Sequence, residues 1–146
     1  MEVFANQPQK QATVFKYSTP EIQQGKTIKW LCKSDIVYAG VQVIASGGEN
    51  NMHSHSGQDG VFIVLKGRAR FYGENDVLIA EVGPLEGVLI PRDLHYWFES
   101  SSEEVLELLQ VESLDKRIKN VRTDYTPRMP GREANGPHNM DEKTSG

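Results

Sequence analysis

The sequence has little of what disulfide-rich, membrane-spanning or nucleic-acid-binding proteins need. It contains one cysteine, Cys32, which cannot form a disulfide within the chain. The first ten residues hold no apolar stretch of the signal-peptide type, so we expect a protein of the reducing cytoplasm. No apolar run approaches the roughly 20 residues that a membrane-spanning helix requires. The formal net charge is −4, which argues against a nucleic-acid partner because such partners select basic surfaces.

Short apolar segments separated by turn residues make up most of the chain. They span residues 27–32, 37–45, 60–65, 69–72, 77–80, 87–91, 95–98 and 105–111. Short strands at roughly 8–12-residue spacing are typical of an all-β sandwich or barrel. A length of 146 residues suits one domain. We therefore expect antiparallel strands over residues 13–112, preceded by a flexible segment at residues 1–12.

The composition changes near Ser113. Residues 113–146 carry seven Lys or Arg and five Asp or Glu, with few large apolar side chains among them. Such a segment cannot bury enough surface to fold alone. We predict a polar C-terminal tail that is either mobile, the preferred interpretation, or packed across the barrel mouth or a partner subunit.

Three of the four histidines form the candidate functional site. His53 and His55 are two residues apart, and residues i and i+2 of a strand point to the same face. Both imidazoles can therefore bind one cation, and imidazole suits iron, zinc, manganese or nickel rather than calcium. His95 follows a proline-marked turn and is the candidate third ligand, whereas His138 lies in the polar tail.

The segments around these histidines resemble the two sequence motifs of the cupin superfamily. The first segment is GGENNMHSHSGQDGVFIVLKG, and the second is GVLIPRDLHYWF. The glycines, histidines and proline that match the motifs are Gly47, His53, His55, Gly67, Pro91 and His95. The resemblance covers roughly residues 35–112. It implies a jelly-roll barrel of two antiparallel sheets, of the RmlC-like type, with a metal ion inside its wide mouth.

Two departures from the motifs affect the expected site. The position of the first motif's glutamate falls on Gly60, which has no side chain. Asp59 is adjacent but would point to the opposite face, and Gln58 shares the parity of Gly60, so each is a less favoured fourth ligand. The second motif is one residue shorter than usual before His95, with Asp93 near the place of its glycine.

Without the glutamate, the resemblance implies a three-histidine site with open coordination positions. Cupins of this kind include thiol dioxygenases and dioxygenases that cleave diketones or aromatic acids. The leading hypothesis is therefore a metal-dependent dioxygenase that acts on a small organic molecule and holds one divalent ion, with Fe²⁺ favoured and Zn²⁺, Mn²⁺ or Ni²⁺ as alternatives. Competing hypotheses are a metal-dependent isomerase, lyase or decarboxylase, and a non-catalytic cupin that binds a sugar or another small molecule.

Parity suggests which residues line a substrate pocket. Trp97 shares the face of His95, and Phe62 and Val64 share the face of Gly60, although both are equally well explained as core. Arg92 is a candidate for binding a substrate carboxylate. The sequence selects no catalytic residue. Because barrels of this kind expose sheet edges, we also expect a homodimer, with residues 13–33 as a source of the added strand.

Overall fold

The computed structural model describes residues 11–46 and 51–127. The strands are β1 (Gly25–Lys33), β2 (Val37–Ser46), β3 (His53–His55), β4 (Gln58–Lys66), β5 (Ala69–Tyr72), β6 (Leu78–Val82), β7 (Gly87–Ile90), β8 (Trp97–Ser100), β9 (Leu106–Leu114) and β10 (Arg122–Asp124). A short 3-10 turn, η2 (Glu74–Asp76), joins β5 to β6. Each predicted apolar segment therefore contains a strand, and the all-β expectation is confirmed.

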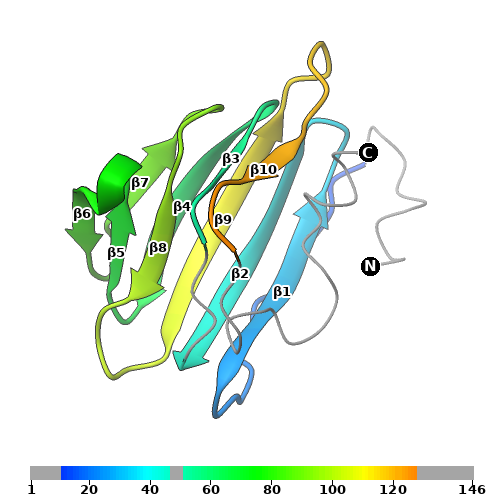
Figure 1. The fold of residues 1–146 in the computed structure, drawn as a ribbon. Coiled ribbons are helices and arrows are strands. Elements are labelled where there is room, and N and C mark those ends of the chain that lie inside the picture. The colour runs from blue at the N-terminus through cyan, green and yellow to red at the C-terminus, as the bar shows by residue number, and fades with distance from the viewer. Residues whose placement is uncertain (1–10, 47–50, 128–146) are drawn as a thin grey trace.

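The strands form two facing layers of antiparallel sheet (Figure 1). One layer is a five-stranded sheet in the order β1-β2-β9-β4-β7. The other contains the three-stranded sheet β6-β5-β8 and the pair β10-β3. A bridge between His53 and Tyr96 links β3 to the segment just before β8. The result is the expected jelly-roll architecture. The described residues include no helix that is long and apolar enough to cross a membrane.

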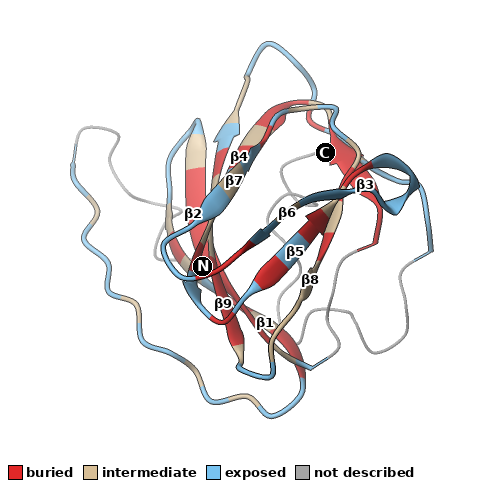
Figure 2. Ribbon diagram, turned by 90° about the vertical axis from the view of Figure 1, so that its left-hand side faces the viewer, coloured by how far each residue is buried: buried red, intermediate tan, exposed pale blue. Residues whose placement is uncertain are grey.

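Buried and more exposed residues alternate along several strands (Figure 2), and the buried apolar side chains form a core between the two layers. Phe62 of β4 contacts Phe71 of β5 and Phe98 of β8, with ring centroids 5.5 and 6.1 Å apart. Leu106 and Leu108 of β9 complete this core and are fully buried. Each such side chain contributes roughly 1.5–3 kcal/mol on burial. The apolar core therefore determines which side of each strand faces inward.

The N-terminal segment covers part of the outer face of the five-stranded sheet. Tyr17 and Ile22 pack against the buried outward-facing side chains Val41 and Val43 of β2. The hydroxyl of Tyr17 donates a hydrogen bond to Glu107 of β9. Glu107 is therefore a buried carboxylate on the outer side of the sheet.

The chain beyond residue 112 is part of the folded structure as far as residue 127. β9 continues to Leu114, and β10 pairs with β3. Between them, Asn120 is buried and donates a hydrogen bond to the side-chain oxygen of Gln58 at 2.6 Å. The mobile-tail interpretation is thus corrected for residues 113–127, while residues 1–10 and 128–146 lie outside the described part of the chain.

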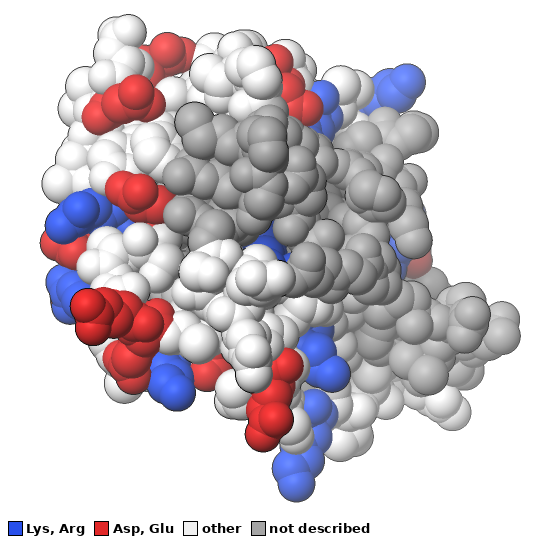
Figure 3. Space-filling model, turned by 60° about the horizontal axis from the view of Figure 1, so that its bottom comes forward, with Lys and Arg blue, Asp and Glu red and all other residues white. Residues whose placement is uncertain are grey.

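Figure 3 shows how charge is distributed over one face of the molecule. Acidic and basic side chains are interspersed along the left and lower margins of this view. Neither sign gathers into a continuous patch on the described residues of that face.

Candidate functional site

His53 and His55 lie together on β3, inside the barrel. They are 2 % and 7 % exposed, and their ring centroids are 5.1 Å apart. The Nδ1–H of His53 donates to the carbonyl oxygen of Asn51 at 2.6 Å, which leaves Nε2 as the acceptor nitrogen. Burial and the positive charge of Arg122 lower the pKa of His53, so this imidazole is neutral at pH 7.

The structure does not bring His95 to this pair. His53 and Tyr96 exchange two backbone hydrogen bonds of 3.0 Å, so they are directly opposite in an antiparallel bridge. Opposed residues project to the same side, and the ring of Tyr96 accordingly lies 4.5 Å from that of His53. The neighbouring His95 therefore projects to the other side of the chain.

On that outer side, the imidazole of His95 has partners of its own. It contacts the carboxylate of Glu74 and stacks on Tyr125 with ring centroids 3.9 Å apart. The physical reason is register, because a change of one residue moves a strand's side chains to its other face. The motif's shortened loop before His95 is a change of that size.

The donor set therefore does not fit the three-histidine metal centre that the resemblance implies. Among residues 11–46 and 51–127, no group of three or more His, Cys, Asp or Glu side chains is arranged to hold a metal ion. The expected three-histidine site is corrected to a pair, His53 and His55.

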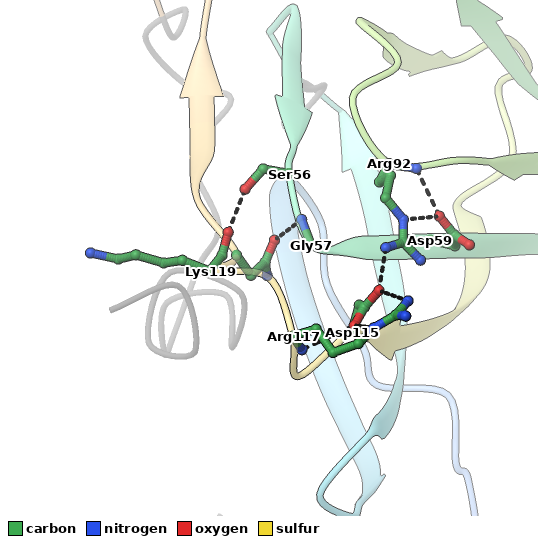
Figure 4. A network of polar contacts seen from close by, with 8 residues as sticks. Ser56, Gly57, Asp59, Arg92, Asp115, Arg117 and Lys119 are labelled. Carbon is green, nitrogen blue, oxygen red and sulfur yellow. Dashed lines mark hydrogen bonds and ion pairs between the residues drawn. The ribbon is translucent and has the colours of Figure 1, made fainter.

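Asp59 and Arg92 contact each other at the barrel rim (Figure 4). Asp59 Oδ1 accepts a hydrogen bond from the backbone N–H of Arg92 at 2.8 Å. The Nη1 of Arg92 donates to Asp115 at 2.6 Å, and Arg117 donates to the same carboxylate. Hydrogen bonds from Arg117 and Arg92 lower the pKa of Asp115. Asp59 as a metal ligand and Arg92 as a substrate anchor are thus both replaced by a structural ion-pair network.

Trp97 lies on the same side as His95, as the parity argument expected, but that side is the outside of the barrel. Its Nε1–H donates to Asp76 at 2.7 Å, and its ring stacks on Tyr72 at 4.4 Å. Val64 is fully buried in the core. Neither side chain is among the described residues that line the interior cavity.

A small cavity opens beside His55 in the barrel interior. Its described lining residues are His55, Gln58, Gly60, Phe62, Ile90, Pro91, Tyr96 and Glu112. About 10 Å³ is open to the centre of a water molecule, which is the space of a single small polar group. The sequence suggested Phe62 as a pocket residue and Gln58 as a less favoured metal ligand. It did not place Tyr96 or Glu112 at the pocket.

Glu112 is the centre of a buried polar cluster next to this cavity. It is 2 % exposed and lies directly across from Gly60 in the β4–β9 pairing. Gln58 Nε2 donates to Glu112 Oε2 at 3.0 Å, and the hydroxyl of Tyr38 donates to Gln58 Oε1 at 3.1 Å. The alternation of β9 contains a signal for this cluster. Its inward positions are apolar at Leu106 and Leu108 and polar at Gln110 and Glu112.

Comparisons with known proteins agree on the fold. The sequence model of a family described as a cupin domain matches residues 40–112. An uncharacterised Klebsiella pneumoniae protein with a double-stranded β-helix domain has 12 % identity and a TM-score of 0.63, over 80 % of this chain and 100 % of that one. An RmlC-like cupin from Methanocaldococcus jannaschii has 16 % identity and a TM-score of 0.59, over 70 % and 91 %.

A cupin superfamily protein from Desulfitobacterium hafniense has 18 % identity and a TM-score of 0.57, over 66 % of this chain and 84 % of that one. No curated protein sequence matches this chain. At these identities, the solved structures show the fold alone.

Proposed function

Because the chain belongs to the cupin family, we propose that it binds a small molecule inside its barrel, at the cavity beside His55. The observation that carries this proposal is the composition of the cavity wall. His55, Gln58, Tyr96 and Glu112 supply polar groups, while the described apolar wall is formed by Phe62, Ile90 and Pro91. Apolar walls with a few convergent polar groups are typical of small-molecule sites.

The size of the cavity limits how a ligand binds there. Since about 10 Å³ is open to the centre of a water molecule, one hydroxyl or amine group of a ligand fits. The site therefore recognises one polar end group of its ligand.

A cavity-filling variant tests this proposal. Ile90 lines the cavity, whereas the adjacent Leu89 points outward and is 63 % exposed. A library of small polar metabolites would be screened by thermal shift, and hits would be titrated by NMR. We expect Ile90→Phe to abolish binding and Leu89→Phe to retain it. Hits that bind both variants equally, or shift only resonances of outward-facing residues, would contradict a binding site inside the barrel.

A metal-dependent enzyme is the second candidate function, favoured by the orientation of His53. Its Nδ1–H is fixed on the carbonyl of Asn51, which is the outer contact that metal-binding imidazoles use. Dioxygenase chemistry with Fe²⁺ comes first within this class. Isomerase, lyase or decarboxylase chemistry with Zn²⁺, Mn²⁺ or Ni²⁺ follows.

Elemental analysis of protein from metal-replete medium distinguishes the two candidates. Stoichiometric metal that is lost in His55→Ala and retained in His95→Ala, together with substrate-dependent oxygen uptake, would favour the enzyme. The small-molecule binder predicts ligand binding that does not change when the protein is treated with a chelator.

A further inference from the structure

A carboxylate lies beside the position at which this chain lacks the glutamate of the first motif. The motif's glutamate position falls on Gly60, and Gly60 is paired directly with Glu112 of β9. Directly opposed residues of an antiparallel pair project to the same face. A Cβ atom at residue 60 would lie 2.8 Å from Oε2 and 2.9 Å from Oε1 of Glu112. The carboxylate of Glu112 therefore occupies the space into which a side chain at position 60 would extend.

Side-chain amides fix the position of this carboxylate. Gln58 donates to Oε2 at 3.0 Å, and Gln110 donates to Oε1 at 2.5 Å. Both oxygens of Glu112 thus accept a hydrogen bond from a side-chain amide. A carboxylate offers about four acceptor positions, so it can accept a hydrogen bond from a ligand beside the two amides.

The charge at the cavity wall has one sign. Glu112 is the acidic side chain among the described residues that line the cavity. Lys26 and Arg122 carry positive charges that act on His53, but neither is among the described lining residues. A ligand group in the cavity therefore lies next to one acidic side chain, and the described lining residues include no Lys or Arg.

We propose that Glu112 determines the specificity of the cavity, because it supplies from β9 the acidic group that the motif carries on β4. The site then takes a neutral or cationic hydrogen-bond donor of a small molecule and rejects an organic anion. This inference rests on the proposed function and adds the chemical class of the ligand. It applies to a binding protein and to an enzyme alike.

Three probes of nearly equal shape test the inference: acetamidinium, acetamide and acetate, with charges of +1, 0 and −1. Each would be titrated into the ¹⁵N-labelled full chain, with the side-chain amides of Gln58 and Gln110 as reporters. We expect acetamidinium and acetamide to shift these resonances. We expect acetate to bind at least about tenfold more weakly than acetamidinium, because a hydrogen bond to a charged group contributes enough free energy to change the affinity by that factor.

Variants assign the preference to the carboxylate. Glu112→Gln should bring the three affinities within about threefold of each other, because a threefold difference is within the range that one neutral hydrogen bond contributes. The double variant Gly60→Glu/Glu112→Gly returns a carboxylate to β4 and should restore the preference for acetamidinium. The matched control is Glu107→Gln, because Glu107 is an equally buried glutamate of β9 on the outer face, and it should leave the preference unchanged.

Each outcome decides the question. Acetate binding as tightly as acetamidinium, or a preference that survives Glu112→Gln, overturns the role of Glu112 and leaves the proposed function intact. Cavity resonances that respond to none of the probes overturn both. If Glu112→Gln fails to fold, as judged by circular dichroism, the double variant decides alone. A folded double variant that binds acetate as tightly as acetamidinium refutes the inference.

Discussion

At the scale of single residues, burial determines the ionisation of His53. This imidazole is 2 % exposed, and burial followed by the charges of Arg122 and His55 lowers its pKa from 6.5. The unfolded chain therefore binds a proton below pH 6.5 that the folded chain does not bind. Stability rises with pH wherever the unfolded state binds more protons.

The free energy of unfolding should thus decrease as the pH falls below 6.5, by at most about 1.4 kcal/mol per pH unit from this residue. Urea denaturation between pH 7.5 and 5.0 measures the slope. His53→Gln should flatten it. Equal slopes in the wild type and His53→Gln would contradict the assignment.

The pairing of Gly60 with Glu112 leads to a second prediction at the residue scale. A methyl group at position 60 would approach the carboxylate oxygens to within 3 Å, so the amide contacts of Glu112 must shift. We expect Gly60→Ala to destabilise the protein by about 1–3 kcal/mol. Gly73→Ala is the control, because its nearest atom would lie at an ordinary 3.6 Å.

Chemical denaturation of Gly60→Ala, of Glu112→Ala and of the double variant Gly60→Ala/Glu112→Ala completes a double-mutant cycle. The cost of Gly60→Ala should be smaller when Glu112 is alanine. Equal costs in both backgrounds would mean that the carboxylate does not occupy the space next to Gly60.

At the scale of elements, the buried side chain of Asn120 joins the segment before β10 to the barrel. Asn120 donates to Gln58 at 2.6 Å, and its oxygen accepts from the backbone N–H of Gly57 at 3.1 Å. The same short segment returns as β10 to pair with β3. The two hydrogen bonds of Asn120 therefore help to hold the connection between β9 and β10, which has no regular secondary structure, against the barrel.

Asn120→Ala removes both hydrogen bonds and leaves buried groups without their partner. We expect a loss of about 1–3 kcal/mol in the free energy of unfolding, with faster hydrogen exchange at the β10 amides. Lys119→Ala is the matched control, because Lys119 contributes its backbone carbonyl to Ser56 (Figure 4). Unchanged exchange in Asn120→Ala would show that β10 is held by other contacts.

At the scale of the whole molecule, the outer face of the five-stranded sheet is apolar where the N-terminal segment does not cover it. Val61 of β4 and Leu89 of β7 are cross-strand neighbours that are 39 % and 63 % exposed, and Leu65 is 37 % exposed. Contiguous exposed apolar surface is characteristic of interaction sites. The sequence predicts a homodimer that pairs through sheet edges, and we propose that a homodimer buries this apolar face symmetrically.

We expect light scattering to give the mass of two chains for the wild type. The double variant Val61→Lys/Leu89→Lys should give the mass of one chain, because it places charges at the centre of the face. Lys66→Ala, at the end of β4, should remain dimeric. A monomeric wild type at micromolar concentration would refute the predicted homodimer.

The strands were predictable because their signal is local. Segments such as 37–45 and 60–65 alternate around β-branched and aromatic residues, and the core that they form requires that alternation. Parity also placed Gln58 and Phe62 on one face of β4, and both line the cavity, although the sequence named Gln58 as a metal ligand and left Phe62 open as core. His95 and Trp97 were correctly placed on a common face, but the side of the barrel on which that face lies depends on the turn before them.

The amino-acid sequence by itself determined the two-layer β architecture, the His53–His55 pair and the family, because these follow from periodicity and short motifs. Tertiary structure decided which long-range partners meet. The His53–Tyr96 bridge points His95 outward. The Gly60–Glu112 pair places a carboxylate from β9 next to Gly60, where the motif has a glutamate. Both depend on strand register, which is set by contacts between residues distant in the chain.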